Sequence, residues 1–489
     1  MLQASLAYLS MFLAIGACAG DGPRQKDKLD ARAIVEALES TLSETIARTD
    51  PSVVGVSRIK NGESRGETPA IHRKNAPPRP PRNDLRFVPR DEDFQSFDYG
   101  SGVVVGDSGE ILTAFHVVKG ASTIIVRARG TQQFEAEVLA ADPRSDLAVI
   151  VPARILGVAP PTLKPIAIGK AEKLRKGSFL LALGNSFNAM RFRDNADAAM
   201  NSRDGEASAS WGILSNVARR VEPGPGEVGL RMLRHCPTLL QLDAKLNLGM
   251  SGGAVVNLNG ELVGLTTTTG ATVGEDFMAG YAIPLDRLGR RIVDTLKKGL
   301  EVEYGFLGVG LDARVSNQVK TVEPLTPAGQ AGLVVGDVIV AVDQAPVADG
   351  DSLTLALADC PVGKPVSIKI NRDGKILNMS ILLSKFPLRG EVIATNRPEP
   401  WRGLRVDFTS MLAGGELTDA ILQAMTRGGV GVVEVVAGSP ADKAGFKHGQ
   451  IITAVDGKPV RSPAEFHAAV ENRRGPVKLT ADEHAVTVP

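Results

Sequence analysis

Short apolar runs separated by turn residues recur between Gly100 and about Leu300. Glycine, aspartate and asparagine interrupt these runs at short intervals, a pattern that is typical of β-barrels and β-sandwiches. We expect strands at Val103–Val105, Thr123–Val126, Leu147–Val151, Phe179–Leu183, Gly212–Val217, Ala254–Val256 and Leu262–Thr267. The hydrophobic pattern therefore predicts a mainly β domain in the middle of the chain.

A helical period appears on either side of this β-rich region. The stripe before it consists of Ile34, Leu38, Leu42 and Ile46, and the stripe after it of Leu285, Leu288, Ile292 and Leu296. The first stripe predicts a helix that ends before Pro51 and packs on the following domain, within an N-terminal helical segment at 20–50. Residues 61–96 are rich in Pro, Arg and Asp without a sustained period, which predicts a mobile loop.

The last third of the chain contains an internal repeat. The segment Thr326–Leu333 resembles Ser439–Phe446, and each copy continues into the pattern Gly-x-x-Ile-x-Ala-Val-Asp. The two copies begin 113 residues apart, which is too long for a solenoid unit and suits a small domain. We expect two copies of one module, at 300–388 and 401–489, joined by a linker at 389–400.

Composition supports this organisation and excludes some partners. A chain of 489 residues is expected to hold roughly three domains at about 150 residues each. Lys plus Arg number 56 and Asp plus Glu 55, so no surplus positive charge is present to hold nucleic acid. The three cysteines, Cys18, Cys236 and Cys360, favour neither a disulfide framework nor a metal cluster. We expect no metal and no cofactor.

The first 19 residues have the composition of an export signal. An apolar stretch is followed by small residues and is too short for a full membrane span. Ile15–Cys18 resembles a bacterial lipobox, in which the cysteine becomes a lipid anchor, whereas Ala17–Ala19 fits ordinary signal cleavage. An uncleaved anchor helix is the third alternative. We expect an exported protein of the periplasm or cell envelope, and the lipid anchor at Cys18 stays open.

A serine in a glycine-rich segment is the candidate nucleophile. Acyl transfer needs a hydroxyl, a base, a carboxylate that orients the base, and donors for the oxyanion. Ser251 lies in the segment Gly249–Gly253, in which glycines permit a tight turn and a close approach of the substrate backbone. The backbone N–H groups of Gly249 and Ser251 are the candidate oxyanion hole.

The base and the carboxylate have one candidate each. His116 follows the apolar run Ile111–Phe115, and Asp146 precedes the apolar strand Leu147–Val151. A single histidine or aspartate in such a place is more often structural, and Asp142 fits the structural alternative of a turn or helix-cap residue. The candidates gain weight because all three groups of a Ser-His-Asp triad are present.

Taken together, the three motifs resemble the HtrA/Deg (DegP-like) family of trypsin-fold serine endopeptidases, in the order His, Asp, Ser. Further matching segments are Gly100–Val103, Leu240–Ala244, Asn257–Gly264 and Gly280–Pro284. The resemblance runs from about Pro51 to the C-terminus. It implies a trypsin-like double β-barrel protease domain at 51–299, cleavage of unfolded or damaged exported proteins, and a homotrimer or an assembly of trimers.

The same resemblance identifies the repeated modules as PDZ domains. Such domains bind peptide termini or exposed peptides by adding them as a strand to a sheet edge. The implied peptide-binding loop of the first domain is Phe306, Leu307, Gly308 and Val309. In the second domain the corresponding loop includes Gly403 and Leu404.

The sequence departs from the family pattern at several positions. Met250 precedes the serine where the family usually has Asn, which leaves open a catalytically weak or inactive chaperone or PDZ scaffold. Lys245 lies six residues before the serine, at the base of the primary specificity pocket of the trypsin fold. Its ammonium would favour an acidic P1 residue, unless it points away or pairs with an acid such as Asp243 or Glu275. The long polar stretch Met190–Ala207 is either a gating loop or a tolerated insertion.

Overall fold

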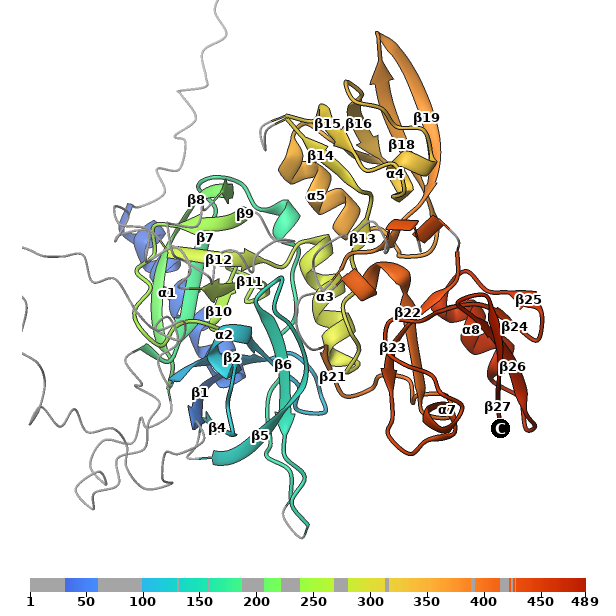
Figure 1. Ribbon diagram of the computed structural model, residues 1–489. Helices are drawn as coiled ribbons and strands as arrows, with labels where there is room; N and C mark the ends of the chain where they lie inside the picture. Colours follow the sequence, from blue (N-terminus) through green and yellow to red (C-terminus); the bar gives the residue numbers. More distant parts are fainter. Residues whose placement is uncertain are drawn as a thin grey trace, which may run out of the picture. The chain divides into compact units, whose positions relative to one another are not determined.

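The computed structural model describes twelve stretches of the chain (Figure 1). These are residues 31–59, 99–129, 132–156, 159–186, 206–220, 238–267, 280–312, 316–387, 392–413, 422–423, 425–426 and 428–489. Several predicted features lie outside these stretches: the export signal, Cys18, Cys236, Glu275, the loop at 61–96 and most of Met190–Ala207. No helix in the described stretches combines the length and the apolar character needed to cross a membrane.

The predicted N-terminal helix is confirmed as α1 (Ala31–Thr49). It ends where the chain enters a 3-10 turn, η1 (Asp50–Ser52), whose proline cannot continue the helical hydrogen bonding. Residues 31–44 of this helix belong to a unit of their own, in which Ile34 is half exposed. Beyond it, Thr45 is buried and its hydroxyl donates to the Leu258 carbonyl at 3.0 Å.

Six antiparallel strands form the first β-barrel, in the order β5-β4-β1-β2-β3-β6, and the pairing of β5 with β6 closes it. They are β1 (Val53–Ile59), β2 (Tyr99–Val104), β3 (Ile111–Ala114), β4 (Thr123–Ala128), β5 (Gln132–Asp142) and β6 (Leu147–Pro152). The side chains of β4 alternate between buried and half-buried, as expected for a strand with one face on a core. The strands expected at 103, 123 and 147 are confirmed as β2, β4 and β6, whereas β1 and β5 were not predicted.

Six further strands close the second barrel, in the order β10-β11-β12-β9-β8-β7. They are β7 (Phe179–Gly184), β8 (Ser208–Arg220), β9 (Thr238–Leu242), β10 (Ala254–Val256), β11 (Leu262–Thr267) and β12 (Gly280–Pro284). The second predicted helix is α3 (Arg287–Lys297), whose first turn is capped by Asp286, which accepts from the Gly289 N–H at 2.9 Å. The expected double β-barrel is therefore confirmed.

The two repeated modules each have their own hydrophobic core. The first contains β13 (Gly305–Phe306), β14 (Val309–Leu311), β15 (Val319–Val322), α4 (Pro327–Gln330), β16 (Val338–Val342), β17 (Ala345–Pro346), α5 (Gly350–Ala358), β18 (Pro365–Arg372), β19 (Lys375–Leu382) and β20 (Ser384–Lys385). The second contains β22 (Leu404–Phe408), β23 (Val430–Val435), α7 (Pro440–Lys443), β24 (Ile451–Val455), β25 (Lys458–Pro459), α8 (Pro463–Val470), β26 (Val477–Ala481) and β27 (His484–Val488).

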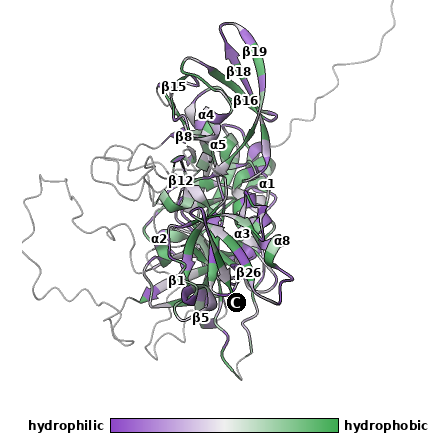
Figure 2. Cartoon of the chain, turned by 45° about the vertical axis from the view of Figure 1, so that its right-hand side comes forward, coloured by the Kyte–Doolittle hydropathy of each residue, from purple (hydrophilic) through white to green (hydrophobic). Residues whose placement is uncertain are grey.

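The sequence repeat has the same structure in both modules. Its first part forms the short helices α4 and α7, and its second part forms the strands β16 and β24. In the first module, Val366, Ile368 and Ile370 of β18 alternate with more exposed residues, and the β18–β19 hairpin shows both hydrophobic and hydrophilic residues in Figure 2. The repeat is therefore one supersecondary unit used twice.

A short strand after the first module joins the sheet of the first barrel. This strand, β21 (Ile393–Ala394), pairs antiparallel with Ala141 and Ala140 of β5. The β4 strand pairs only with the first half of β5, up to Ala136, and β21 takes the edge that β4 leaves open. The predicted linker at 389–400 thus contains a strand that sequence periodicity did not indicate.

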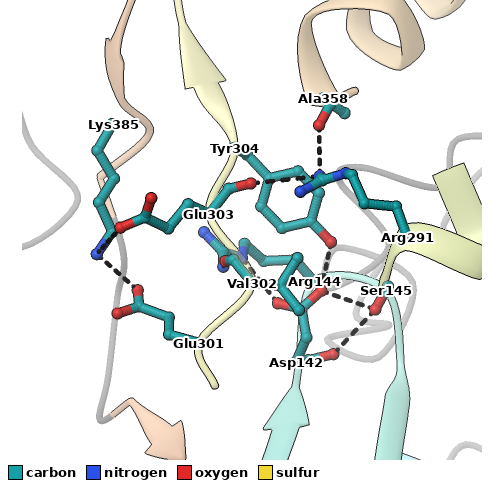
Figure 3. Close-up of polar contacts among 10 residues, drawn as sticks. All are labelled: Asp142, Arg144, Ser145, Arg291, Glu301, Val302, Glu303, Tyr304, Ala358 and Lys385. Atoms are coloured by element: carbon teal, nitrogen blue, oxygen red, sulfur yellow. Dashed lines mark hydrogen bonds and ion pairs between the residues drawn. The ribbon is translucent and has the colours of Figure 1, made fainter. Parts of the chain in front are cut away.

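A buried ion cluster forms around Lys385, whose contacts with Glu301 and Glu303 are drawn in Figure 3. The Lys385 side chain is 1% exposed, and its ammonium lies 2.9 Å from Glu301, 3.3 Å from Glu303 and 2.7 Å from Asp407. Burial raises the pKa of the Glu301 carboxyl, because desolvation disfavours its charged form. The three carboxylates compensate a charge that would otherwise be costly to bury.

Candidate active site

The structure brings His116 and Asp146 into direct contact. His116 lies on the single-turn helix α2 (Phe115–Val118), directly after β3, and Asp146 ends the turn between β5 and β6. The Nδ1 atom of His116 lies 2.7 Å from Oδ2 of Asp146, and the His116 backbone N–H donates to Oδ1 at 2.9 Å. A carboxylate oxygen can only accept, so Nδ1 carries the ring proton. The pair therefore fixes the imidazole with a basic Nε2.

Nε2 of His116 is the atom available as a base. It is buried and has no hydrogen-bond partner within the part of the chain that the structure describes. The side chains of His116 and Asp146 are 18% and 9% exposed, respectively. Limited solvent access strengthens the interaction that the Asp146 carboxylate can make with a protonated imidazole ring.

Asp146 adopts a left-handed backbone conformation, with φ of 55°. Aspartate tolerates this region better than most residues, but it still costs about 1 kcal/mol and needs support from its surroundings. Part of that support is a hydrogen bond from the Phe115 N–H to the Asp146 carbonyl at 2.9 Å. Both the backbone and the side chain of Asp146 therefore form hydrogen bonds with the helix that carries His116.

The glycines beside Ser251 are required by the backbone. Gly249 and Gly252 have φ of 89° and 82°, and a Cβ on either would lie 2.3 Å from a backbone oxygen. A Cβ on Gly252 would also lie 3.0 Å from the backbone nitrogen of Ala114, which precedes the histidine helix. The turn that carries Ser251, itself 5% exposed, is therefore next to the start of the helix that carries His116.

Two residues that sequence reasoning did not single out support the serine turn. The hydroxyl of buried Ser101 donates to the Gly249 carbonyl at 2.7 Å and accepts from the Asn185 N–H at 2.7 Å. The hydroxyl of Thr266 donates to the Met250 carbonyl and accepts from the Gly253 N–H at 2.9 Å. Only the Gly-Ser-Gly string around Ser101 gave a signal, as part of the family resemblance.

Met250 is buried, and the turn keeps its shape through the backbone. Its carbonyl accepts from the Gly253 N–H at 2.8 Å, and its sulfur accepts from the Asn247 N–H at 3.4 Å. The Met250 backbone lies close to Gly184, where a Cβ would lie 3.1 Å from the Met250 Cα. The side-chain amide that the family usually has at this position is not needed to close the turn.

Lys245 is exposed on the segment that follows β9. Asp243, one of the acids considered as its partner, instead accepts from the Ile213 N–H at 2.5 Å. An exposed ammonium is solvated and needs no acidic partner. The role of Lys245 in P1 preference and the oxyanion roles of Gly249 and Ser251 stay predictions.

The predicted loops of the two modules are built alike. In the first, Gly308 has φ of 85°, and a Cβ there would lie 2.2 Å from Cβ of Thr326. In the second, Gly403 has φ of 83°, and a Cβ would lie 2.1 Å from Cβ of Ser439. Thr326 and Ser439 are the first residues of the two repeat segments, so each glycine loop packs on the start of its repeat.

The residues around these glycines have different degrees of burial. Leu307 and Leu404 are buried, whereas Phe306 and Val309 are half-buried at the ends of β13 and β14. The Leu307 carbonyl accepts from the Ala328 N–H at 2.9 Å, at the start of α4. Leu307 and Leu404 thus face the interiors of their modules, whereas Phe306 and Val309 are partly accessible on the first module.

Known proteins resemble this chain over most of its length. Residues 100–265 match a family model described as trypsin-like peptidase domain, and residues 305–383 and 431–481 match two PDZ domain models. The periplasmic serine endoprotease DegP of Salmonella typhimurium is 30% identical over 390 residues, which cover 76% of this chain and 72% of that protein. DegP of Escherichia coli K12 is 29% identical over 405 residues, which cover 80% and 75%.

A solved structure of the HtrA-type protease AlgW with a tripeptide also aligns with this chain. Its TM-score is 0.49 and its sequence identity 24%, and the alignment covers 71% of this chain and 97% of that one.

Proposed function

Because this chain belongs to the DegP family of trypsin-like serine endoproteases with PDZ domains, we propose that His116, Asp146 and Ser251 are its catalytic triad. The observation that carries the proposal is the pair of hydrogen bonds that the ring and the backbone N–H of His116 donate to Asp146. These bonds set the tautomer that leaves Nε2 as the base.

The proposed reaction follows from the roles of these groups. Nε2 of His116 takes the proton of the Ser251 hydroxyl as its oxygen attacks the peptide carbonyl, and Asp146 stabilises the resulting imidazolium. The N–H groups of Gly249 and Ser251 stabilise the oxyanion. His116 then protonates the leaving amine, and water hydrolyses the acyl-enzyme in a second addition. These proposed reaction steps need neither a metal nor a cofactor.

The alternative is a catalytically weak HtrA-like chaperone or PDZ scaffold, for which Met250 is the one favouring residue. The closed backbone of the serine turn argues for the peptidase. Digestion of an unfolded protein by the wild type, with Ser251→Ala and His116→Ala as controls, tests the choice. Cleavage by the wild type alone supports the triad, and equal cleavage by all three would overturn it.

The proposed setting is the periplasm or cell envelope. The two DegP relatives are named periplasmic serine endoproteases, and the N-terminal residues of this chain have the composition of an export signal. We propose unfolded or damaged exported proteins as substrates. The lipid anchor at Cys18 and the trimeric assembly stay predictions.

The first PDZ domain is proposed to bind peptide segments along β14. Among the described strands, β14 pairs only with β15, which leaves its other edge open for an added strand. Val309 and Leu311 of β14 and Leu357 of α5 are half-buried at the margin of the domain core. These side chains would receive apolar residues of the peptide.

The second PDZ domain is proposed to use the loop at Gly403 and Leu404 in the same way. Here the Trp401 ring packs edge-on against Phe466 of α8, at 6.0 Å between centroids. The loop of the first domain has a comparable pair, in which Phe306 packs edge-on against Phe386 at 5.9 Å between centroids. The two assignments can be tested separately by measuring the binding of labelled peptides. The wild type is compared with a Leu311 variant for the first domain and with a Trp401 variant for the second.

A further inference from the structure

A buried carboxylate outside the triad organises the turn that carries Asp146 (Figure 3). Asp142 ends β5 and is 2% exposed. It accepts hydrogen bonds from Arg144 Nε at 2.9 Å, from the Ser145 hydroxyl at 2.7 Å and from the Tyr304 hydroxyl at 2.5 Å. Two of these donors belong to the turn itself, and the third comes from a distant segment.

That distant segment is the connector (Leu300–Tyr304), which leads from α3 to the first strand of the first PDZ domain. Tyr304 is fully buried, and the guanidinium of Arg144 lies 4.3 Å above its ring centroid. Arg144 also donates to the Val302 carbonyl at 2.5 Å. The connector therefore contacts the turn through a hydroxyl, an aromatic face and a backbone carbonyl.

The turn leaves little freedom between Asp142 and Asp146. Asp142 pairs with Leu147 across the β5–β6 ladder, so the turn consists of residues 143–146 alone. Ser145, which precedes Asp146, is tied to Asp142 through its hydroxyl and its backbone N–H. The left-handed conformation of Asp146 persists only while its surroundings hold it. A shift of the Asp142 carboxylate is therefore transmitted to Asp146.

We propose that Tyr304 and Arg144 are positioning residues for Asp146 and act through Asp142. The proposal rests on the triad proposed above. Neither residue touches the substrate. They hold the turn in the conformation in which both oxygens of Asp146 face His116.

A second contact fixes the strand that leads into this turn. Ile393 and Ala394 of β21 pair with β5 directly before Asp142. The segment before the first PDZ domain therefore contacts the turn, and the segment after that domain contacts the strand β5. The placement of Asp146 depends on segments that lie outside the two barrels in sequence.

Tyr304→Phe is the first test variant, because it removes one hydrogen-bond donor and keeps the ring that fills the site. We expect kcat for a peptide substrate to fall about tenfold, with KM changed less than about twofold. The acidic limb of the kcat/KM profile should move to lower pH, since a displaced carboxylate stabilises the His116 imidazolium less. A purely structural role would not move this limb.

Arg144→Lys is the second variant, and it should change the same two quantities. Lysine keeps the charge but loses the planar fork that contacts Asp142, Val302 and the Tyr304 ring. The matched control is Asp351→Asn, which weakens the ion pair between α5 and Arg220 of β8. This control perturbs the attachment of the first PDZ domain without contacting Asp142.

The outcomes separate the two proposals. Wild-type kcat and an unchanged pH profile in both test variants would overturn the positioning role, as would an equal change in Asp351→Asn. The triad itself is checked by labelling Ser251 of the wild type with a fluorophosphonate. No labelling would refute the triad, and the positioning proposal with it. Thermal denaturation of each variant establishes that the compared proteins are folded.

Discussion

Replacing Asp146 with asparagine alters the proposed base while hardly changing the shape of the site. Asp146 accepts two hydrogen bonds from His116, at 2.7 Å from Nδ1 and 2.9 Å from the backbone nitrogen. Asparagine offers one acceptor oxygen, so its NH2 group must face one of these nitrogens. With the oxygen on the backbone N–H, the NH2 group donates to Nδ1 and moves the imidazole proton to Nε2. A protonated Nε2 cannot take the proton of Ser251.

The expected loss in kcat is about 10⁴-fold, or about 5.4 kcal/mol, as found when a triad aspartate is neutralised. This exceeds the roughly 1.5–3 kcal/mol of one hydrogen bond to a charged group, because the tautomer changes as well. The assay is hydrolysis of a fluorogenic peptide near neutral pH, with kcat and KM determined separately.

The matched control is Asp286→Asn, another largely buried acid of the same domain. Burial raises the pKa of Asp286, and its carboxylate caps α3, a role that asparagine fills equally well. We expect this control to keep wild-type kcat. If kcat of Asp146→Asn stayed within tenfold of the wild-type kcat, the Asp146–His116 pair would not determine which nitrogen of His116 acts as the base.

Three further predictions concern other parts of the chain. Gly252→Ala should abolish activity and lower the melting temperature much more than Gly445→Ala does. Both glycines have positive φ, but only at Gly252 would the added Cβ lie 2.3 Å from a backbone oxygen. Equal effects of the two substitutions would contradict this reasoning. The Arg372 guanidinium bonded to Asp337 holds the pKa of that carboxyl below its ordinary 3.8, so this stabilisation is present above pH 3.8 and is lost as the pH falls further. Acid denaturation of Arg372→Met should therefore begin at higher pH than in the wild type, and coinciding curves would refute the assignment. Cleavage-site profiling of a denatured protein should show acidic P1 residues if Lys245 reaches the pocket, and only Val, Ile or Ala at P1 would refute that role.

The sequence predicted those parts of the fold that have local patterns. The apolar runs at Val103, Thr123 and Leu147 became barrel strands, because each run has a buried face in a closed sheet. The β5 strand was missed because polar residues interrupt its apolar ones, and only Ala136 and its last three residues are buried. The strand β21 was missed because its two residues are too few to show a period.

The candidate site was predictable as far as its motifs reach. His116, Asp146 and Ser251 were found from short strings, and the first two lie together as expected. The contact of Tyr304 with Asp142 joins residues that are 162 positions apart, and no local sequence pattern predicts it. Supporting residues of this kind follow from packing in three dimensions.

The most direct test of the proposed triad is reaction of the purified protein with a fluorophosphonate probe, followed by mass spectrometry of the labelled peptide. The proposed mechanism predicts one modified residue, Ser251, and no label in Ser251→Ala or in wild-type protein denatured beforehand. Absence of label from the folded wild type, even with unfolded protein or peptide ligands of the PDZ domains added, would contradict an assembled triad and favour the chaperone or scaffold.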